Sequence, residues 1–337
     1  MMAFVHFTSG NFQTVDILLG LAARYVFMLG AHLYPALDLD HASSDSTSII
    51  NRTIIHRRNL FWLCYILDKE LSFRTGFPPS INDTSCDLRP PTNYLDADTQ
   101  SMPQYFPGDL RLSRIKSRAY NNLYSPQAMK RTDAEILKEI RELDDELEKW
   151  RISLPSVSRP SLTYSTESSK FSPFSSEDKI HVCLLRLEYY HCTAAIHQAS
   201  NRCKTWFDKD SGVMEGVGSS LAISVEASRS TIRCLEASQD LLHDHIFWVL
   251  LFYPITAVLT LFFNVLHEPL HPMVALDLKL LKSAVCCLRQ ACSRTRGLAV
   301  NEVLHIKFVD DFVTELVRLA RCAMDKAKQQ QRETSGT

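Results

Sequence analysis

The sequence predicts an all-α protein. Glycine is scarce, at 10 of 337 residues, and leucine-rich stretches of roughly ten to twenty-five residues recur along the chain. Short β-branched runs between turn signals are few. Hydrophobic residues make up 45% of the sequence, which is enough for one large core or two smaller ones. We therefore expect about nine or ten helices in a single compact unit, with at least one helix buried in its centre.

The order of the helices follows from the apolar periodicity. The expected helices are 15–31, 53–75, 111–124, 133–154, 176–204, 219–243, 246–266, 273–296 and 300–326. Gly76 provides a C-terminal stop for the second helix, and Pro78 and Pro79 cannot continue it. The polar residues 36–52 and the Pro-, Asn- and Asp-rich residues 77–109 are expected to be loops.

The helix at 133–154 has the cleanest pattern in the chain. Its apolar residues recur at steps of four and three, and they are Ile136, Ile140, Leu143, Leu147, Trp150 and Leu154. This spacing places them on one face, with acidic and basic residues on the others. Fewer than three heptads are present, so the pattern favours packing on the protein's own domain over a dimerising coiled coil.

A serine- and proline-rich segment at 155–176 interrupts the helices. Its composition is typical of a flexible linker or a long loop. We therefore divide the chain into residues 1–154, the N-terminal part, and residues 177–326, the C-terminal helical part of the same domain. Residues 327–337 form a polar tail.

The sequence HEPLH at 267–271 matches the H-E-x-x-H pattern of zinc peptidases. In those enzymes both histidines lie one turn apart on an unbroken helix and bind the metal. Here Pro269 stands between them and Pro272 follows, so a helix cannot continue through the segment. We expect His267 to end one helix and His271 to lie beyond the break, without a metal.

The acidic run DDELE at 144–148 resembles the aspartate-rich magnesium motif of terpene synthases, which are also helical. Carboxylates on one helix face suit Mg²⁺. Here Asp144, Asp145 and Glu148 alternate with Lys and Arg beside the apolar face, and no second magnesium motif follows. We favour a solvated charged face. A magnesium-dependent enzyme of terpene-synthase type remains an alternative.

Residues 246–266 carry no charge and are long enough to span a bilayer. Pro254, two threonines and Asn264 interrupt the segment, and its flanks lack the Lys/Arg cluster that would orient a spanning helix. A buried helix in a large core explains the same pattern. We favour the buried helix, with a membrane-attached helical protein as the alternative.

Composition excludes several other functions. The net charge of −1 lacks the basic surplus of a free-standing nucleic-acid binder. The ten cysteines include no C-x₂-C pair, so no cysteine-rich zinc module can be drawn, and free thiols fit a reducing compartment. No phosphate-binding glycine loop or G-x-S-x-G element occurs. We expect no catalytic, metal-binding or cofactor-binding residues in this chain.

One stretch carries a specific resemblance. Residues 56–91, HRRNLFWLCYILDKELSFRTGFPPSINDTSCDLRPP, resemble the signature of the fungal-specific transcription factor domain, the middle homology region of fungal zinc-cluster regulators. The later stretch LFFNVLHEPLHPMVALDLKLLKSA resembles that family's N-x-L-x-x-P…D-x-x-L-L pattern. The signature positions that match in kind and spacing are Arg57, Arg58, Leu60, Phe61, Trp62, Tyr65, Leu67, Asp68, Ser72, Gly76, Pro78, Pro79, Asp83 and Asp87.

The resemblance implies the regulatory region of a fungal transcription factor, acting in the nucleus on RNA polymerase II transcription without chemistry of its own. The implied partners are the transcription machinery or a regulatory protein, a second copy of the chain, or a small-molecule effector, with no membrane. Family members usually begin with a six-cysteine zinc cluster that reads DNA, and that cluster is missing here. Zinc and DNA contact are therefore expected only through the missing module.

The signature residues also carry a structural expectation. We expect 60–67 to be buried in the helical bundle and Gly76 with the proline pair to turn the chain sharply. Asp68 should pair with Arg57, Arg58 or Arg74 near the edge of the core. Most signature residues would then be determinants of the fold, while the corner between helix and loop could contact an effector or partner.

Overall fold

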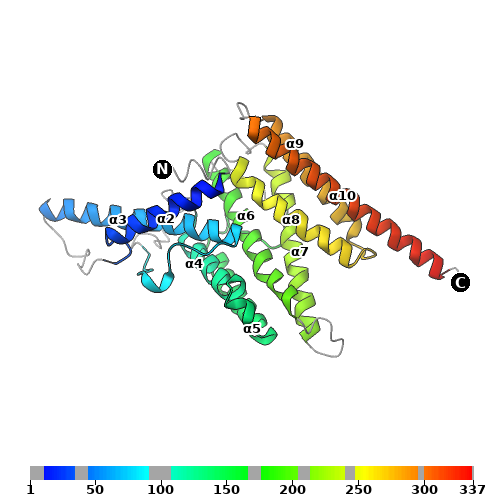
Figure 1. The fold of residues 1–337 in the computed structure, drawn as a ribbon, viewed down its shortest axis with the longest axis horizontal. Helices are drawn as coiled ribbons and strands as arrows, with labels where there is room; N and C mark the ends of the chain where they lie inside the picture. The colour runs from blue at the N-terminus through cyan, green and yellow to red at the C-terminus, as the bar shows by residue number, and fades with distance from the viewer. Residues whose placement is uncertain are drawn as a thin grey trace. The chain divides into compact units, whose positions relative to one another are not determined.

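The computed structural model describes residues 11–34, 45–90, 108–165, 176–203, 213–239, 247–294 and 300–335 (Figure 1). Within these ranges the regular structure is helical, which confirms the predicted all-α class. The α-helices are α2 (Phe12–Met28), α3 (Asp45–Thr75), α4 (Leu110–Ala119), α5 (Asp133–Ile152), α6 (Ser176–Gln198), α7 (Val213–Ala237), α8 (Phe247–His267), α9 (Val274–Arg294) and α10 (Val300–Ser335). One π-helical turn, Tyr120–Tyr124, continues α4.

The chain forms two compact units rather than the single one that we expected. Unit 1 comprises Met1–Arg131 and Asp145–Pro155, and unit 2 comprises Thr132–Asp144 and Ser156–Thr337. The physical reason is that the apolar residues close around separate centres, one among α2, α3 and α4 and another among α7 to α10. The apolar face of α5 is buried throughout, which confirms that it packs on its own protein.

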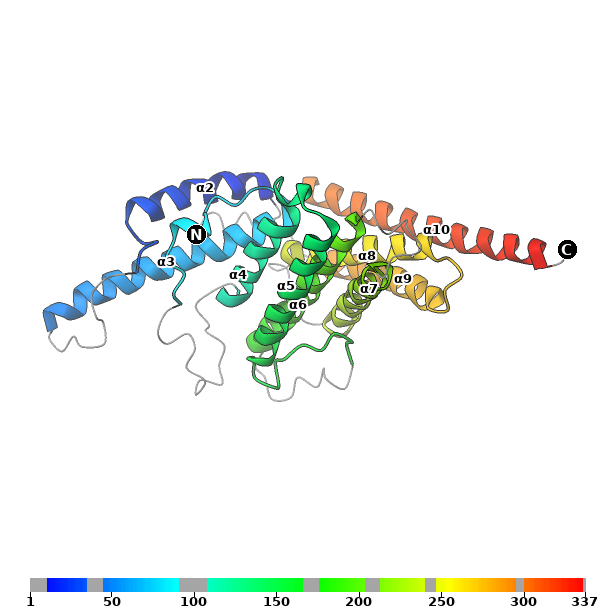
Figure 2. The ribbon, with the colours of Figure 1, turned by 90° about the horizontal axis from the view of Figure 1, so that it is seen from below.

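In unit 1, α2 lies along α3 (Figure 2), and α3 also packs on α4. Their shared cluster contains Ala23, Val26, Ala31, Phe61, Trp62, Tyr65, Ile66, Ile81 and Leu110. Asn11 and Asp109 cap the N-termini of α2 and α4 by accepting backbone N–H bonds. Helix α3 begins at Asp45, so the expected loop at 36–52 is wrong in its second half. Residues 35–44 lie outside the described part of the chain.

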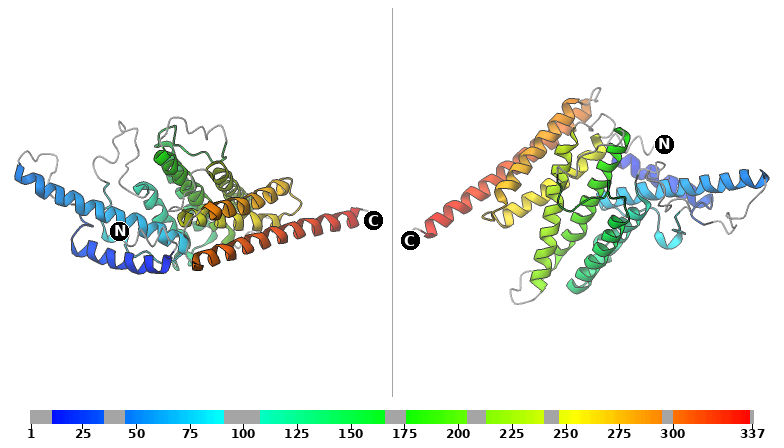
Figure 3. Two further views of the ribbon diagram at one scale, coloured as in Figure 1. Left: turned by 90° about the horizontal axis from the view of Figure 1, so that it is seen from above. Right: turned by 180° about the vertical axis from the view of Figure 1, so that it is seen from behind.

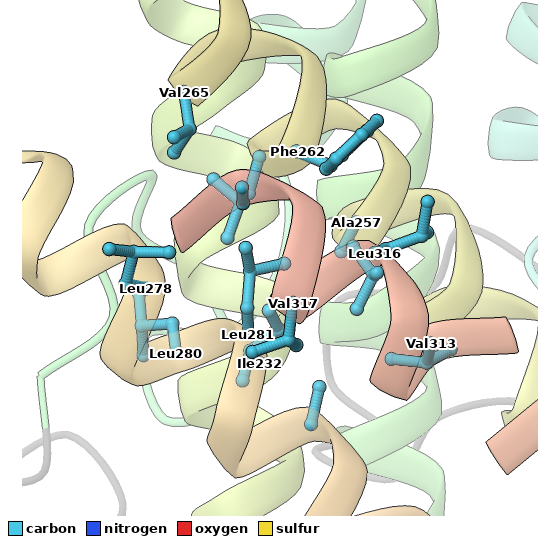
Figure 4. Close-up of a cluster of buried hydrophobic side chains, with 14 of the residues drawn as sticks. Ile232, Ala257, Phe262, Val265, Leu278, Leu280, Leu281, Val313, Leu316 and Val317 are labelled. Carbon is cyan, nitrogen blue, oxygen red and sulfur yellow. The ribbon is translucent and has the colours of Figure 1, made fainter. Parts of the chain in front are cut away.

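In unit 2, helices α7 to α10 enclose the larger apolar cluster (Figure 4). Leu261 of α8, Leu281 of α9 and Val313 of α10 are fully buried in it. Helices α9 and α10 run side by side, and α10 continues past α9 (Figure 3). It extends beyond the expected end at 326, into the predicted polar tail, because Lys, Gln, Arg and Glu are good helix formers.

Helix α8 has the buried centre that its uncharged sequence predicted. Tyr253, Ala257 and Leu261 are buried, whereas Phe263 and Leu266 are exposed, so its burial is not complete all round. Among the residues that the structure describes, no helix is both long and apolar enough to cross a membrane.

The described part of the serine- and proline-rich segment forms a loop on unit 2. The amide of Tyr164 donates to the Ser230 hydroxyl at 2.9 Å, and that hydroxyl donates to the Leu162 carbonyl at 2.6 Å. The Tyr190 hydroxyl donates to the Ser161 carbonyl at 3.0 Å. These bonds hold residues 161–164 on α6 and α7. Residues 166–175 lie outside the described part of the chain.

Candidate functional site

The signature residues lie on α3 from Arg57 onward and on the loop at 76–90, which together we call the α3 corner. Phe61, Trp62 and Tyr65 are buried with mutual edge or tilted ring contacts of 5.1–5.8 Å. Arg57 is on the exposed side of the helix, and Leu60 is partly exposed. The expectation of burial throughout 60–67 is therefore wrong at Leu60, which lies on the outer face of α3, and Leu63 and Cys64 are only half-buried.

Arg58 joins three segments of unit 1. Its guanidinium donates to the Ala31 carbonyl at 3.2 Å, the Asp87 carbonyl at 2.9 Å and the Arg89 carbonyl at 3.1 Å. It also lies 4.8 Å from the centre of the Phe61 ring. Burial lowers the pKa of Arg58, and Asp87 partly offsets this effect. The planar fork of arginine suits this task, because one group can reach several carbonyls at once.

Asp68 holds the other end of the loop. Its two oxygens accept the amide of Ser80 at 2.7 Å and that of Ile81 at 3.1 Å, and Lys69 lies at 3.4 Å. Burial raises the pKa of Asp68, while Lys69 and the two amides act in the opposite direction. The expected pairing with an arginine is wrong. Backbone amides of the loop donate to the carboxylate instead, and the spacing of residues in the sequence could not predict these hydrogen bonds.

A chain of buried charges accompanies Asp68. Lys69 donates to the Ile81 carbonyl, pairs with Asp83 at 3.1 Å and lies 4.9 Å from the centre of the Tyr65 ring. Glu70 pairs with Arg74 at 2.5 Å and with Lys116 of α4. Sequence reasoning missed both buried lysines. The signal for Lys69 was the D-K-E triplet inside an otherwise apolar run, and Lys116 lies outside that triplet, on α4.

The turn after α3 follows from three residues. The helix ends at Thr75, and Gly76 takes a φ of 75°, which a side chain would disfavour. The Ser72 hydroxyl donates to the Phe77 carbonyl at 2.6 Å. Pro78 and Pro79 then lead the chain back toward Ser80. Phe77 itself is 59% exposed, and this leaves an aromatic ring on the surface of the corner.

The α3 corner combines a buried, hydrogen-bonded interior with a few exposed residues, which we call its exposed rim. Its buried acids, cations and backbone groups satisfy one another as described above. Within the described ranges, no group of three His, Cys, Asp or Glu side chains could hold a metal ion. The exposed residues of this rim are Phe77 at the turn and, several helical turns earlier on α3, Leu60 and Arg57. Such residues can contact another molecule, but they offer no nucleophile and base pair.

The acidic run at 144–148 is not gathered into a site. Asp144 pairs with His197 at 3.3 Å, and Asp145 pairs with Lys149 at 2.5 Å. Glu146 pairs with Arg118 of α4, and Glu148 pairs with Arg151 of α5 itself. The carboxylates therefore diverge to separate basic partners, as expected of a charged helix face.

The HEPLH segment is a boundary between helices. Helix α8 ends at His267, and α9 begins at Val274. Both histidines and Glu268 are exposed, and His271 accepts the amide of Met273 through Nδ1 at 3.2 Å. The prediction that the prolines break the helix here is confirmed.

The second resembling stretch contains a buried carboxylate. Asp277 is 0% exposed and receives two bonds from Arg229 of α7, at 2.6 and 3.0 Å. Asn264 of α8 donates to the same carboxylate at 3.1 Å. Asp277 therefore links α7, α8 and α9. Arg229 could not be identified from the sequence, because it lies on another helix.

Comparison with known proteins agrees with the resemblance. A family model described as the fungal specific transcription factor domain matches residues 1–152. An "ABC-transporter-regulating transcription factor" of Aspergillus fumigatus is 29% identical over 81% of this chain and 31% of its own length. An uncharacterised transcriptional regulatory protein of Schizosaccharomyces pombe is 27% identical over 86% of this chain and 37% of its own length.

A third relative, the "Fusaridione A cluster transcription factor" of Fusarium heterosporum, is 24% identical over 80% of this chain and 49% of its own length. No solved structure matches the chain. The chain thus spans about a third to a half of the length of these curated relatives. Residues 1–152, which include the whole α3 corner, match the model of the fungal specific transcription factor domain family.

Proposed function

We propose that this chain is the regulatory region of a fungal transcription factor that controls RNA polymerase II transcription in the nucleus. The match of residues 1–152 to the transcription factor domain supports this proposal most directly. The names of the relatives, which are transcription factors and transcriptional regulators, support it further. In this role the chain performs no chemistry and acts through contacts with other molecules.

The exposed rim of the α3 corner is the surface that we assign to those contacts. Phe77 lies at the turn that follows α3, and Asp68 holds the loop just beyond that turn. Leu60 and Arg57 are exposed farther back along α3 near Arg58, which holds the end of the same loop. A rigid support lowers the entropy cost of binding a partner. The partner is a component of the transcription machinery or a regulatory protein, and a small-molecule effector or a second copy of the chain would act on the same region.

DNA contact is assigned to a zinc cluster outside these 337 residues. The net charge of −1 gives this chain no basic surplus for phosphate binding. Zinc therefore belongs to the whole transcription factor in this proposal and not to the helices described above.

The magnesium-enzyme alternative has less support. A magnesium site of that type needs carboxylates that converge on one ion. Here Asp144 points to His197 of α6, while Asp145 and Glu148 pair along α5 itself.

A reporter assay tests the proposed function. The chain is fused to a heterologous DNA-binding domain in a fungal reporter strain. We expect activation, repression or an effector-dependent change relative to the DNA-binding domain alone. Phe77→Ala should reduce that response without lowering the amount of fusion protein. Phe308→Ala is the matched control, because Phe308 is an exposed phenylalanine on α10. A fusion that never differs from the DNA-binding domain alone would contradict the proposal.

A further inference from the structure

Two cysteines face each other inside unit 2. Cys183 lies on α6 and Cys234 on α7, and each thiol shifts the pKa of the other as a hydrogen-bond partner. Both are free thiols, and both are buried, at 3% and 0% exposure. Neither takes part in the α3 corner or in the contacts proposed for it.

The register of α6 and α7 accounts for this pairing. His197 of α6 and Ser220 of α7 also meet, with Nδ1 and Oγ 2.8 Å apart. Fourteen residues separate Cys183 from His197, and fourteen separate Ser220 from Cys234. Fourteen residues are nearly four helical turns, so the two residues on each helix share a face. The helices run antiparallel, so the register that joins His197 to Ser220 also places Cys183 of α6 opposite Cys234 of α7.

The two thiols differ in acidity. The hydrogen bond from Cys234 lowers the pKa of Cys183, and the positive charge of Arg186 acts in the same direction against the effect of burial. The hydrogen bond to Cys183 and burial raise the pKa of Cys234. Because the thiolate is the nucleophile, these directions favour Cys183 as the attacking sulfur and Cys234 as the resolving one.

We propose that Cys183 and Cys234 form an oxidative modification site, at which a hydroperoxide produces a disulfide between α6 and α7. The Cys183 thiolate attacks a peroxide oxygen, the O–O bond breaks, and the leaving oxygen takes the thiol proton to become water or an alcohol. Cys183 is then a sulfenic acid. The Cys234 sulfur attacks it, the S–O bond breaks, the S–S bond forms, and a second water leaves with the Cys234 proton.

We expect the disulfide to form only under oxidising conditions, and both thiols to stay reduced otherwise. Thiols in the cytosol and nucleus are normally reduced, and disulfides there are transient or redox-sensing. Hydrogen peroxide is close to water in size, so it can reach a buried thiol that a bulky reagent cannot. The disulfide would tie α6 to α7 across the fifty residues between the two cysteines.

Mass spectrometry of the full chain tests the site. The reduced protein is treated with hydrogen peroxide, unfolded in N-ethylmaleimide and digested. We expect a peptide pair linked through Cys183 and Cys234, which dithiothreitol separates. The thermal midpoint of unit 2 should rise by about 5 °C or more on oxidation and return on reduction.

Variants separate this site from the other thiols. Cys183→Ser and Cys234→Ser should each abolish the linked pair and the thermal shift. A Cys286→Ser/Cys322→Ser chain, which lacks two exposed thiols, should keep both. Circular dichroism checks folding, and Cys183→Ala replaces Cys183→Ser if the serine variant unfolds.

Three results would overturn the proposal. In the first, Cys183 and Cys234 both remain free thiols after peroxide treatment of the folded wild-type chain. In the second, Cys183 is trapped as a sulfenic acid by dimedone but no linked pair forms. In the third, the disulfide joins either cysteine to a different partner.

Discussion

The α3 corner and the α7–α10 core differ in what their helices pack against. In the corner, α3 supports a loop whose backbone amides and carbonyls need hydrogen-bond partners, and Arg58, Asp68 and Lys69 supply them. In the core, helices that satisfy their own backbone pack on one another through apolar side chains, and Asp277 is the centre of one buried polar link. A helix that supports a loop therefore needs buried polar side chains to satisfy the backbone groups of that loop, whereas packed helices satisfy their own backbone groups.

The largest effect should come from the buried link of the core. Asp277→Ala removes the carboxylate that accepts two bonds from the buried Arg229 and leaves it only Glu226, and removing one partner of a buried pair costs about 3–5 kcal/mol. Hydrogen exchange at increasing urea, followed on peptides of α9, measures the unfolding free energy of unit 2. Asp310→Ala is the control, since its pair with Arg289 lies at the surface and its loss should change nothing measurable.

Apolar packing in the core should rank next. Leu281→Ala removes a fully buried side chain and is expected to cost about 3 kcal/mol through lost burial and a residual cavity. The same α9 peptides report the change. The neighbouring Lys282→Ala, at an exposed position, should leave the unfolding free energy unchanged. Equal effects at 281 and 282 would mean that this face of α9 is not the core.

The corner should respond more locally. Arg58→Ala removes three bonds to backbone carbonyls and is expected to cost about 2–3 kcal/mol in unit 1. Peptides from α3 and the loop should lose protection in hydrogen exchange, while peptides from α9 should not. Arg57→Ala is the matched control on the exposed side of the helix. Loss of protection in α9 would show that the two regions are not independent.

Thiol reactivity gives the smallest and most local comparison. Burial raises the pKa of Cys64 and of Cys86 in the corner to about 11. At pH 8 about one thiol in a thousand would then be ionised, and raising the pH to 10 should speed alkylation about a hundredfold. In the core, exposed Cys286 should react well before its buried neighbour Cys287, whose pKa burial also raises. Quantitative alkylation by mass spectrometry measures both, and early reaction of Cys64 would contradict the burial described for the corner.

The sequence was informative where a pattern is local. The steps of four and three in α5 identified a face that is buried in the structure, and Pro269 identified the end of α8. The start of α3 and the end of α10 were misplaced, because polar residues can extend a helix that is anchored elsewhere.

Contacts between distant segments could not be predicted. The partners of Asp68 are backbone amides, which carry no residue identity, and Arg229 reaches Asp277 from another helix. The signature thus located the α3 corner but not its bonding. The Cys183–Cys234 pair likewise depends on the register of α6 and α7, which periodicity within either helix does not determine.

In the α3 corner, buried side chains of α3 fix the loop. Hydrogen exchange of the Ser80 and Ile81 amides tests this role most directly, because both donate to the Asp68 carboxylate. The account predicts that both amides are protected in the wild-type chain and lose that protection in Asp68→Ala, while α9 keeps its own. Amides of Ser80 and Ile81 that exchange freely in the wild-type chain, or that stay protected in Asp68→Ala, would contradict it.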